Sequence, residues 1–149
     1  MISYRDMIAL DVPALIGIEK SVFPESPWSA AQFREELSGV PKTRKYIVAT
    51  QSNEIVGYAG IALAGNVADI HTLTVIPSHR KQGIATSMLD QLEEWGRARN
   101  VDAFMLEMRE GNVEAQPLYE KRGYSIVSRR DNYYAPGIHA LIMRKEVGK

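Results

Sequence analysis

The segment 75–85 carries residue types that could bind an anion. A β-branched apolar run ends at Pro77, and a short loop with Arg80, Lys81 and Gly83 then leads into apolar residues at helical spacing. The first amides of such a helix lack intrahelical acceptors and lie at the positive end of the helix dipole, and glycine lets a ligand approach the main chain. These residues suit a phosphate group, although an ordinary strand-to-helix connection with a capping glycine explains them equally well.

Glu107 and Tyr119 could move protons. Glu107 falls near the end of a short apolar run, where a carboxylate either pairs with a cation such as Arg109 or lies at the mouth of a site that raises its affinity for protons. Tyr119 falls on an amphipathic helical pattern, where tyrosine is more often a packing residue than an acid. From the residues alone, the ion pair and the packing role are the simpler interpretations.

Composition limits the chemistry further. A chain of 149 residues with 45% hydrophobic and 24% charged residues predicts one globular domain over 1–149. Basic and acidic residues number 18 each, so we expect no direct binding to nucleic acid. The absence of cysteine excludes disulfides and an acyl-cysteine intermediate, and His71, His79 and His139 are not spaced like metal ligands. Without a leader or a membrane-length apolar run, a cytoplasmic protein that avoids membranes is expected.

The elements that must position these residues begin with a strand and two helices. The sequence predicts a short strand over 2–5 and a helix over 12–23 that Asp11 caps. A second helix over 29–37 begins with the spacing of a capping box. Trp28 lies at the junction of the two helices, where a tryptophan is usually a packing residue.

Three strands in close succession follow. Residues 46–50, 55–63 and 67–75 are strand-like, and a turn composition separates the first two. They predict an antiparallel meander that ends at the anion-binding loop. From Ile84 onward, an apolar stripe at helical spacing predicts a helix that ends near 99–100 and packs on the sheet.

The C-terminal third supplies the remaining strands. The apolar run 103–108 fits a buried strand that lies parallel to the strand before the loop, because the intervening helix makes a right-handed crossover. Asn112 can cap a helix over 113–122, in which Pro117 kinks or delays the first turn. Two further strands complete the pattern, over 124–130 and 139–144, with a hairpin loop over 129–137.

Two motifs carry a family resemblance, namely Arg80-x-x-Gly83-x-Ala85 and Asn112-x-x-Ala115-x-x-Leu118-Tyr119-x-x-x-Gly123-Tyr124. The first is similar to the [Gln/Arg]-x-x-Gly-x-[Gly/Ala] motif with which the GCN5-related N-acetyltransferase (GNAT) superfamily cradles the pyrophosphate of acetyl-CoA. The second resembles another segment of that superfamily, at the expected distance. The resemblance implies an α/β GNAT (acyl-CoA N-acyltransferase) fold, with a mixed central sheet of about seven strands and about four helices.

The resemblance also implies roles for individual residues. Acetyl-CoA would be the acetyl donor, CoA the product, and no metal would take part. In the family, the strand before the loop splays from its neighbour and pairs with the pantetheine arm. The matching cofactor-binding positions are Leu73, Thr74, Val75, Arg80, Lys81, Gln82, Gly83, Ile84, Ala85, Thr86, Asn112 and Ala115.

Two further segments resemble one branch of the superfamily, the RimI-type enzymes that acetylate the N-terminal alanine of a small-subunit ribosomal protein. The segment 107–112 is similar to their Glu-Val-Arg-x-x-Asn stretch, and 129–134 is similar to their Arg-Arg-x-x-Tyr-Tyr stretch. His139 departs from the acidic residue common near that place. The branch implies a general base at Glu107 and a general acid at Tyr119. The positions implied for the acceptor are Trp28, Arg109, Tyr133 and Tyr134.

The resulting hypothesis is acetyl transfer from acetyl-CoA to a protein N-terminal α-amine by direct attack. The acceptor implied by the branch is the N-terminal alanine of small-subunit ribosomal protein eighteen. Two alternatives stay open: an acetyltransferase for lysine or small-molecule amines, and a CoA-binding module without catalysis. A monomer is favoured, and the sequence does not fix the oligomeric state.

Overall fold

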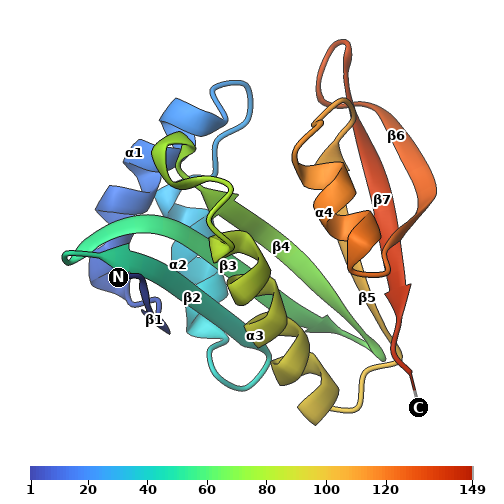
Figure 1. Cartoon of the computed structure of the whole chain (residues 1–149), viewed down its shortest axis with the longest axis horizontal. Coiled ribbons are helices and arrows are strands. Elements are labelled where there is room, and N and C mark those ends of the chain that lie inside the picture. Colours follow the sequence, from blue (N-terminus) through green and yellow to red (C-terminus); the bar gives the residue numbers. More distant parts are fainter. Residues whose placement is uncertain (149) are drawn as a thin grey trace.

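The computed structural model describes residues 1–148 as a seven-stranded mixed sheet with four α-helices (Figure 1), which confirms the predicted fold class. The strands are β1 (Ser3–Asp6), β2 (Arg44–Gln51), β3 (Glu54–Ala64), β4 (Val67–Val75), β5 (Ala103–Arg109), β6 (Ser125–Ala135) and β7 (Ile138–Glu146). The helices are α1 (Val12–Val22), α2 (Ala30–Ser38), α3 (Ile84–Ala98) and α4 (Ala115–Lys121), with short 3-10 turns η1 (Ala9–Asp11) and η2 (Pro77–His79).

The side chains of β2 point alternately to the two faces of the sheet, and each face is covered by helices. Ile47 and Ala49 belong to a core that includes α3 and α4, whereas Tyr46 and Val48 belong to a core that includes α1 and α2. Because successive side chains of a strand point to opposite faces, helices bury the sheet from both sides. Figure 1 shows α3 crossing one face, with α1 and α2 toward the other.

The strand order is β1-β2-β3-β4-β5-β7-β6, and β4 and β5 form its parallel pair. Their pairing covers Val67–Ile70 against Ala103–Leu106 and then stops, although β3 stays paired with β4 as far as Val75. Figure 1 shows β4 and β5 diverging from their common end. The rest of β4, over 71–75, therefore presents its edge to an opening in the sheet.

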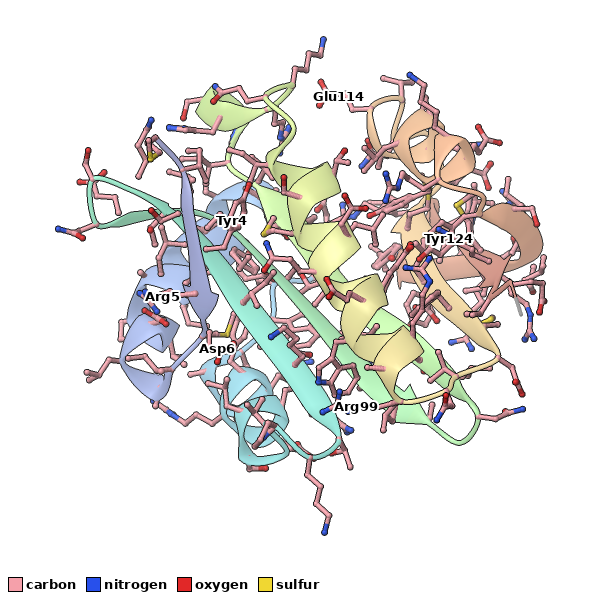
Figure 2. All side chains as sticks on the ribbon, turned by 60° about the horizontal axis from the view of Figure 1, so that its bottom comes forward. Tyr4, Arg5, Asp6, Arg99, Glu114 and Tyr124 are labelled. Atoms are coloured by element: carbon pink, nitrogen blue, oxygen red, sulfur yellow. The ribbon has the colours of Figure 1, made fainter. Side chains whose placement is uncertain are left out.

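Helix α3 packs against strands on both sides of the opening between β4 and β5. Its inner stripe is fully buried, and each such aliphatic side chain contributes about 1.5–3 kcal/mol on burial. The residues of the stripe are Ile84, Met88, Leu89 and Leu92. The same helix buries Glu93, which accepts hydrogen bonds from the Tyr124 hydroxyl (2.8 Å) and Lys145 Nζ (2.7 Å). Figure 2 shows Tyr124 between α3 and the C-terminal strands.

Two predicted caps differ in outcome. The capping box before α2 is confirmed, since the Ser29 hydroxyl accepts from the Gln32 amide and Gln32 Oε1 accepts from the Ser29 amide. Asp11 precedes α1 as predicted, but its side chain does not cap that helix. Its carboxylate instead binds both guanidinium nitrogens of Arg5 and the Ile8 amide, 2.8–2.9 Å away, because η1 turns the side chain toward β1.

Two boundaries in the C-terminal third also differ. The helix expected over 113–122 begins at Ala115, which places Pro117 in the first turn, where its missing N–H leaves no intrahelical bond unmade. Asn112 still accepts from the amides of the next turn, at 3.0 and 3.2 Å. The hairpin loop expected over 129–137 is mostly strand: β6 runs to Ala135, with a bulge in its pairing after Arg130.

Candidate active site

The loop between β4 and α3 leaves the first turn of the helix open. Gly83 is the N-cap of α3 with φ of +81°, a conformation that favours glycine, and in the described chain no side chain accepts a hydrogen bond as its cap. A Cβ built on Gly83 meets no atom within 4 Å, so there is free space above it. Arg80 fastens the loop by donating from Nε to the Val75 carbonyl at 3.0 Å. The uncapped amides therefore face a space that suits an anion.

That space belongs to a cavity of about 570 Å³, called here the loop cavity. All the predicted cofactor-binding residues line it except Gln82. Sequence reasoning missed several other lining residues, which come from the end of α1, the loop and α4: Val22, Phe23, His79, Glu114 and Leu118. Glu114 lies at the start of α4, facing the loop (Figure 2). The N-terminus of α3 and the edge of β4 line this cavity together.

A smaller cavity of about 160 Å³, the central cavity, lies where β4 and β5 separate. Glu107 reaches it from β5 and Tyr119 from α4, so the structure brings the two predicted proton-transfer residues to one space. Leu73 and Thr74 of β4 line both this cavity and the loop cavity. The opening in the sheet therefore connects the two.

The third space, called the hairpin cavity, measures about 620 Å³ and lies between α2 and the β6–β7 hairpin. It shares Trp28, His71, Glu107 and Tyr134 with the central cavity. The three cavities thus form a passage through the sheet, with the loop cavity at one end and the hairpin cavity at the other. An acyl donor and an acceptor could enter from opposite ends and meet in the middle.

Glu107 forms an ion pair, and its partner is Arg130 rather than the neighbouring Arg109. Its carboxylate lies 3.4 Å from Arg130 Nη1, while Arg109 bonds Glu25 at 2.7 Å and Ser26 at 3.3 Å. Arg109 is drawn away because the α1–α2 connection lies over the end of β5. The Glu107 side chain is 33% exposed, and the Tyr133 hydroxyl donates to it. The carboxylate is therefore accessible and faces the central cavity.

Tyr119 is a buried residue whose ring packs edge-on against Tyr124, with centroids 5.9 Å apart. Burial raises the pKa of Tyr119 well above its usual value, and the nearby Tyr134 adds to the effect. The hydroxyl therefore keeps its proton throughout the neutral and mildly alkaline range. The packing role and the proton-donor role are compatible at this position.

Three of the four residues predicted to bind an acceptor, Trp28, Tyr133 and Tyr134, line the hairpin end of the passage, and Arg109 does not. Trp28 both packs and lines the cavity: its ring lies 5.0 Å from Phe33, and it borders the hairpin and central cavities. Tyr133 and Tyr134 contact each other edge-on at 5.1 Å. Arg109 lies 4.9 Å over the Tyr134 ring, and it lines the loop and central cavities rather than the hairpin cavity.

Glu19 is a lining residue that sequence reasoning missed. It is buried on α1, borders the central cavity, and accepts from the Tyr58 hydroxyl at 2.5 Å. Its position four residues after Leu15 places it on the apolar face of the helix, and a charged residue on such a face is the signal that could have revealed it.

Within residues 1–148, no group of three or more His, Cys, Asp or Glu side chains is arranged to hold a metal ion. Over the same residues, no helix is long and apolar enough to cross a membrane.

The splayed mixed sheet, the open N-terminus of α3 and the passage define the class of N-acyltransferases that use acyl-CoA donors. Residues 12–124 match the sequence profile of the Acetyltransferase (GNAT) family, and the chain belongs to this family. It is 33% identical over 129 residues to the N-alpha-acetyltransferase RimI of Mycobacterium tuberculosis, covering 83% of this chain and 78% of that relative. The protein is an acetyl-CoA-dependent N-acetyltransferase.

Two further comparisons agree. The ribosomal-protein-S18-alanine N-acetyltransferase of Escherichia coli has a solved structure that matches with a TM-score of 0.84 at 26% identity, over 100% of this chain and 96% of that chain. An uncharacterised protein of Mycobacterium leprae is 32% identical over 142 residues, covering 91% of this chain; the chain spans 38% of that relative's length. The chain therefore resembles RimI-type enzymes in both sequence and fold.

Proposed function

We propose that this enzyme acetylates the α-amine of a protein N-terminus, and that its acceptor is the N-terminal alanine of small-subunit ribosomal protein eighteen. The observation that carries the proposal is that Glu107 and Tyr119 line one small cavity between the loop cavity and a tyrosine-walled hairpin cavity. Two similar proteins support this choice, since the Mycobacterium tuberculosis relative is an N-alpha-acetyltransferase and the Escherichia coli one is a ribosomal-protein-S18-alanine N-acetyltransferase.

The donor suits the loop cavity. The uncapped amides after Gly83, with Arg80 and Lys81 beside them, would hold the pyrophosphate, and the free edge of β4 over 71–75 would pair with the pantetheine arm. Acetyl-CoA supplies a thioester that an amine can attack. A backbone amide near Leu73 or Val75 would stabilise the oxyanion that develops during attack.

Glu107 acts as general base. An α-amine has a reference pKa of about 8 and is largely protonated at neutral pH, so it must lose a proton before it attacks. The Glu107 carboxylate faces the central cavity and accepts that proton, directly or through water. Arg130 and Tyr133 hold the carboxylate in place.

Tyr119 acts as general acid. Collapse of the addition product expels a thiolate, and a tyrosine whose pKa is raised by burial still carries the proton that the thiolate takes. Because Tyr119 lines both the loop and central cavities, it is within reach of the sulfur end of a donor lying along β4. Proton transfer of this kind contributes roughly 10²–10⁴-fold to the rate.

The hairpin cavity favours a peptide as acceptor. Its aromatic wall, made by Tyr133, Tyr134 and Trp28, gives a chain of residues rather than a single small amine a surface to lie on. Tyr134 is half-buried, and burial followed by the charge of Glu107 raises its pKa to about 12, so its hydroxyl stays a donor.

Acetyl transfer to two matched peptides tests the proposal. One peptide begins with a free Ala-Arg-Tyr, and the other carries a blocked N-terminus and an internal lysine. Transfer to the free N-terminus alone is expected. Transfer to the blocked peptide would point to a lysine acceptor, and transfer to neither would overturn the proposed acceptor and direct the search to small amines or to CoA binding without turnover.

A further inference from the structure

Within the described residues 1–148, two buried carboxylates accept a hydrogen bond from a tyrosine, and one of the two has a cation beside it. Glu93, fully buried on α3, accepts from Tyr124 and also lies 2.7 Å from Lys145 Nζ and 3.0 Å from Arg97 Nη2. Two cations therefore balance its charge. It lines none of the three cavities of the passage.

Glu19 has the opposite surroundings. It is 2% exposed, and its two oxygens accept from the Tyr58 hydroxyl at 2.5 Å and from the Trp28 amide at 2.7 Å. Both donors are neutral. Across residues 1–148, no Lys, Arg or His nitrogen comes within the 4.0 Å of an ion pair with Glu19. Burial of a carboxylate without a cation is costly, so such a group is normally found paired.

The acceptor of the reaction can supply a cation to pair with Glu19. Glu19 borders the central cavity together with Glu107 and Tyr119. The acceptor amine must reach that cavity, and at neutral pH most of it arrives as an ammonium ion. A buried negative charge beside the path of an ammonium ion gives a binding energy that a neutral ligand cannot obtain.

We propose that Glu19 is a substrate-binding residue that receives the acceptor's ammonium group, which completes the ion pair that the folded chain lacks. The inference rests on the proposed function and adds a specificity for cationic amines at the reacting end. Glu107 then removes one proton. The neutral amine keeps N–H donors that Glu19 still accepts, so the same contact orients the nucleophile during attack.

The neighbours of Glu19 keep it fixed. Tyr58 lies on the central strand β3, and burial together with the Glu19 charge holds the pKa of its hydroxyl well above its usual range, so the hydroxyl remains a donor. Trp28 connects the carboxylate to the wall of the hairpin cavity. The charge is therefore held by α1, β3 and the α1–α2 connection at once.

Binding to the complex with CoA tests the inference without turnover. The probes are a short peptide with a free N-terminal alanine and the same peptide lacking the amino group, titrated calorimetrically into the wild type, Glu19→Gln and Glu93→Gln in excess CoA. The wild type should bind the peptide with the free amine at least about tenfold more tightly than the peptide that lacks the amino group. Glu19→Gln should lose that preference, while the matched Glu93→Gln should keep it.

Each outcome has one meaning. A preference that survives in Glu19→Gln, or that is absent from the wild type, overturns the inference. Acetyl transfer that fails with the free N-terminus overturns the proposed function separately. If Glu19→Gln does not fold, NMR of the wild type tests the inference instead. The side-chain carboxyl ¹³C resonance of Glu19 should shift when the amine peptide binds and stay unchanged when the des-amino peptide binds. A resonance that stays unchanged with the amine peptide would refute the assignment.

Discussion

Arg109 Nη1 donates a 2.7 Å hydrogen bond to Glu25 Oε2, which joins the end of β5 to the connection between α1 and α2. The same guanidinium lies over the rings of Phe23 and Tyr134, at 5.6 and 4.9 Å. Arg109 also holds the pKa of the Glu25 carboxyl below its usual value. Arg109 thus links the α1–α2 connection, which carries Trp28, to the end of β5 that lines the passage.

Arg109→Ala should therefore disturb acceptor binding more than donor binding. Release of the α1–α2 connection should raise the peptide KM about tenfold and the acetyl-CoA Kd less than threefold. Initial rates measure the peptide KM, and calorimetry measures the acetyl-CoA Kd. Arg99→Ala is the matched control, because Arg99 lies over Trp95 at the far end of α3 (Figure 2). A larger change in the acetyl-CoA Kd than in the peptide KM would contradict the assignment.

Gly83→Asp should weaken acetyl-CoA binding about a hundredfold. The φ of +81° strains any side chain, and a carboxylate placed at the open amides repels the pyrophosphate. Calorimetry measures the affinity. Gly65→Asp introduces the same charge at a φ of +65° in the β3–β4 turn, away from the cavities, and should leave affinity unchanged. Equal affinity of Gly83→Asp and wild type would remove the phosphate-loop assignment.

Tyr119→Phe should lower kcat about a hundredfold or more and leave the acetyl-CoA Kd within twofold. Because burial raises the pKa of Tyr119 above its ordinary 10.0, wild-type kcat should show no fall from its deprotonation up to about pH 10. Rates measured from pH 6 to 10 check both points, with Tyr4→Phe on β1 as control. Equal losses in kcat and donor affinity would make Tyr119 a packing residue.

Replacement of both Tyr133 and Tyr134 by alanine should raise the peptide KM at least about tenfold, since two aromatic surfaces leave the hairpin cavity. Donor binding should stay nearly intact, because neither tyrosine lines the loop cavity. The double phenylalanine variant keeps the surfaces and should recover most of the loss. The opposite pattern, with weak donor binding and a normal peptide KM, would refute the role of the hairpin.

Asp11→Asn should destabilise the fold by about 1–2 kcal/mol at pH 7. Hydrogen bonds from Arg5 hold the pKa of Asp11 below its ordinary 3.8, so the folded state favours the ionised form. That stabilisation is present above pH 3.8 and is lost as the pH falls below it. Urea unfolding at pH 7, 5 and 3 should show the gap between variant and wild type shrinking, and a constant gap would contradict the ion pair.

Local chemistry was the part of the fold that sequence could predict. The capping box at Ser29 and the turn between β2 and β3, where Ser52 and Asn53 have positive φ, depend on neighbours a few residues away. The predicted cap by Asp11 was wrong, and the cation that pairs with Glu107 could not be chosen, because the partners of both carboxylates lie on other elements. A pattern within one element cannot decide between competing cations.

The candidate site also contains residues that local motifs predict and one residue that only the folded structure reveals. The loop around Gly83 and the segment that begins at Asn112 are contiguous motifs, and the structure brings them together around the loop cavity. Glu19 could not be assigned from its neighbours, because its meaning depends on Tyr58, Trp28 and the absence of a cation near it among residues 1–148. Charge balance in a cavity is a property of the assembled fold.

The separation of β4 and β5 has a mechanical consequence. Four residue pairs, from Val67–Ala103 to Ile70–Leu106, join the two parts of the sheet directly. In the proposed binding mode, a donor along the free edge of β4 would fill the gap between β4 and β5 and contact α4 across it. Binding to the folded state alone raises the melting temperature with ligand concentration. If the donor binds in this way, acetyl-CoA stabilises the two halves of the sheet against separation as well as serving as the substrate, and the enzyme's resistance to heat and proteolysis should rise with the acetyl-CoA concentration.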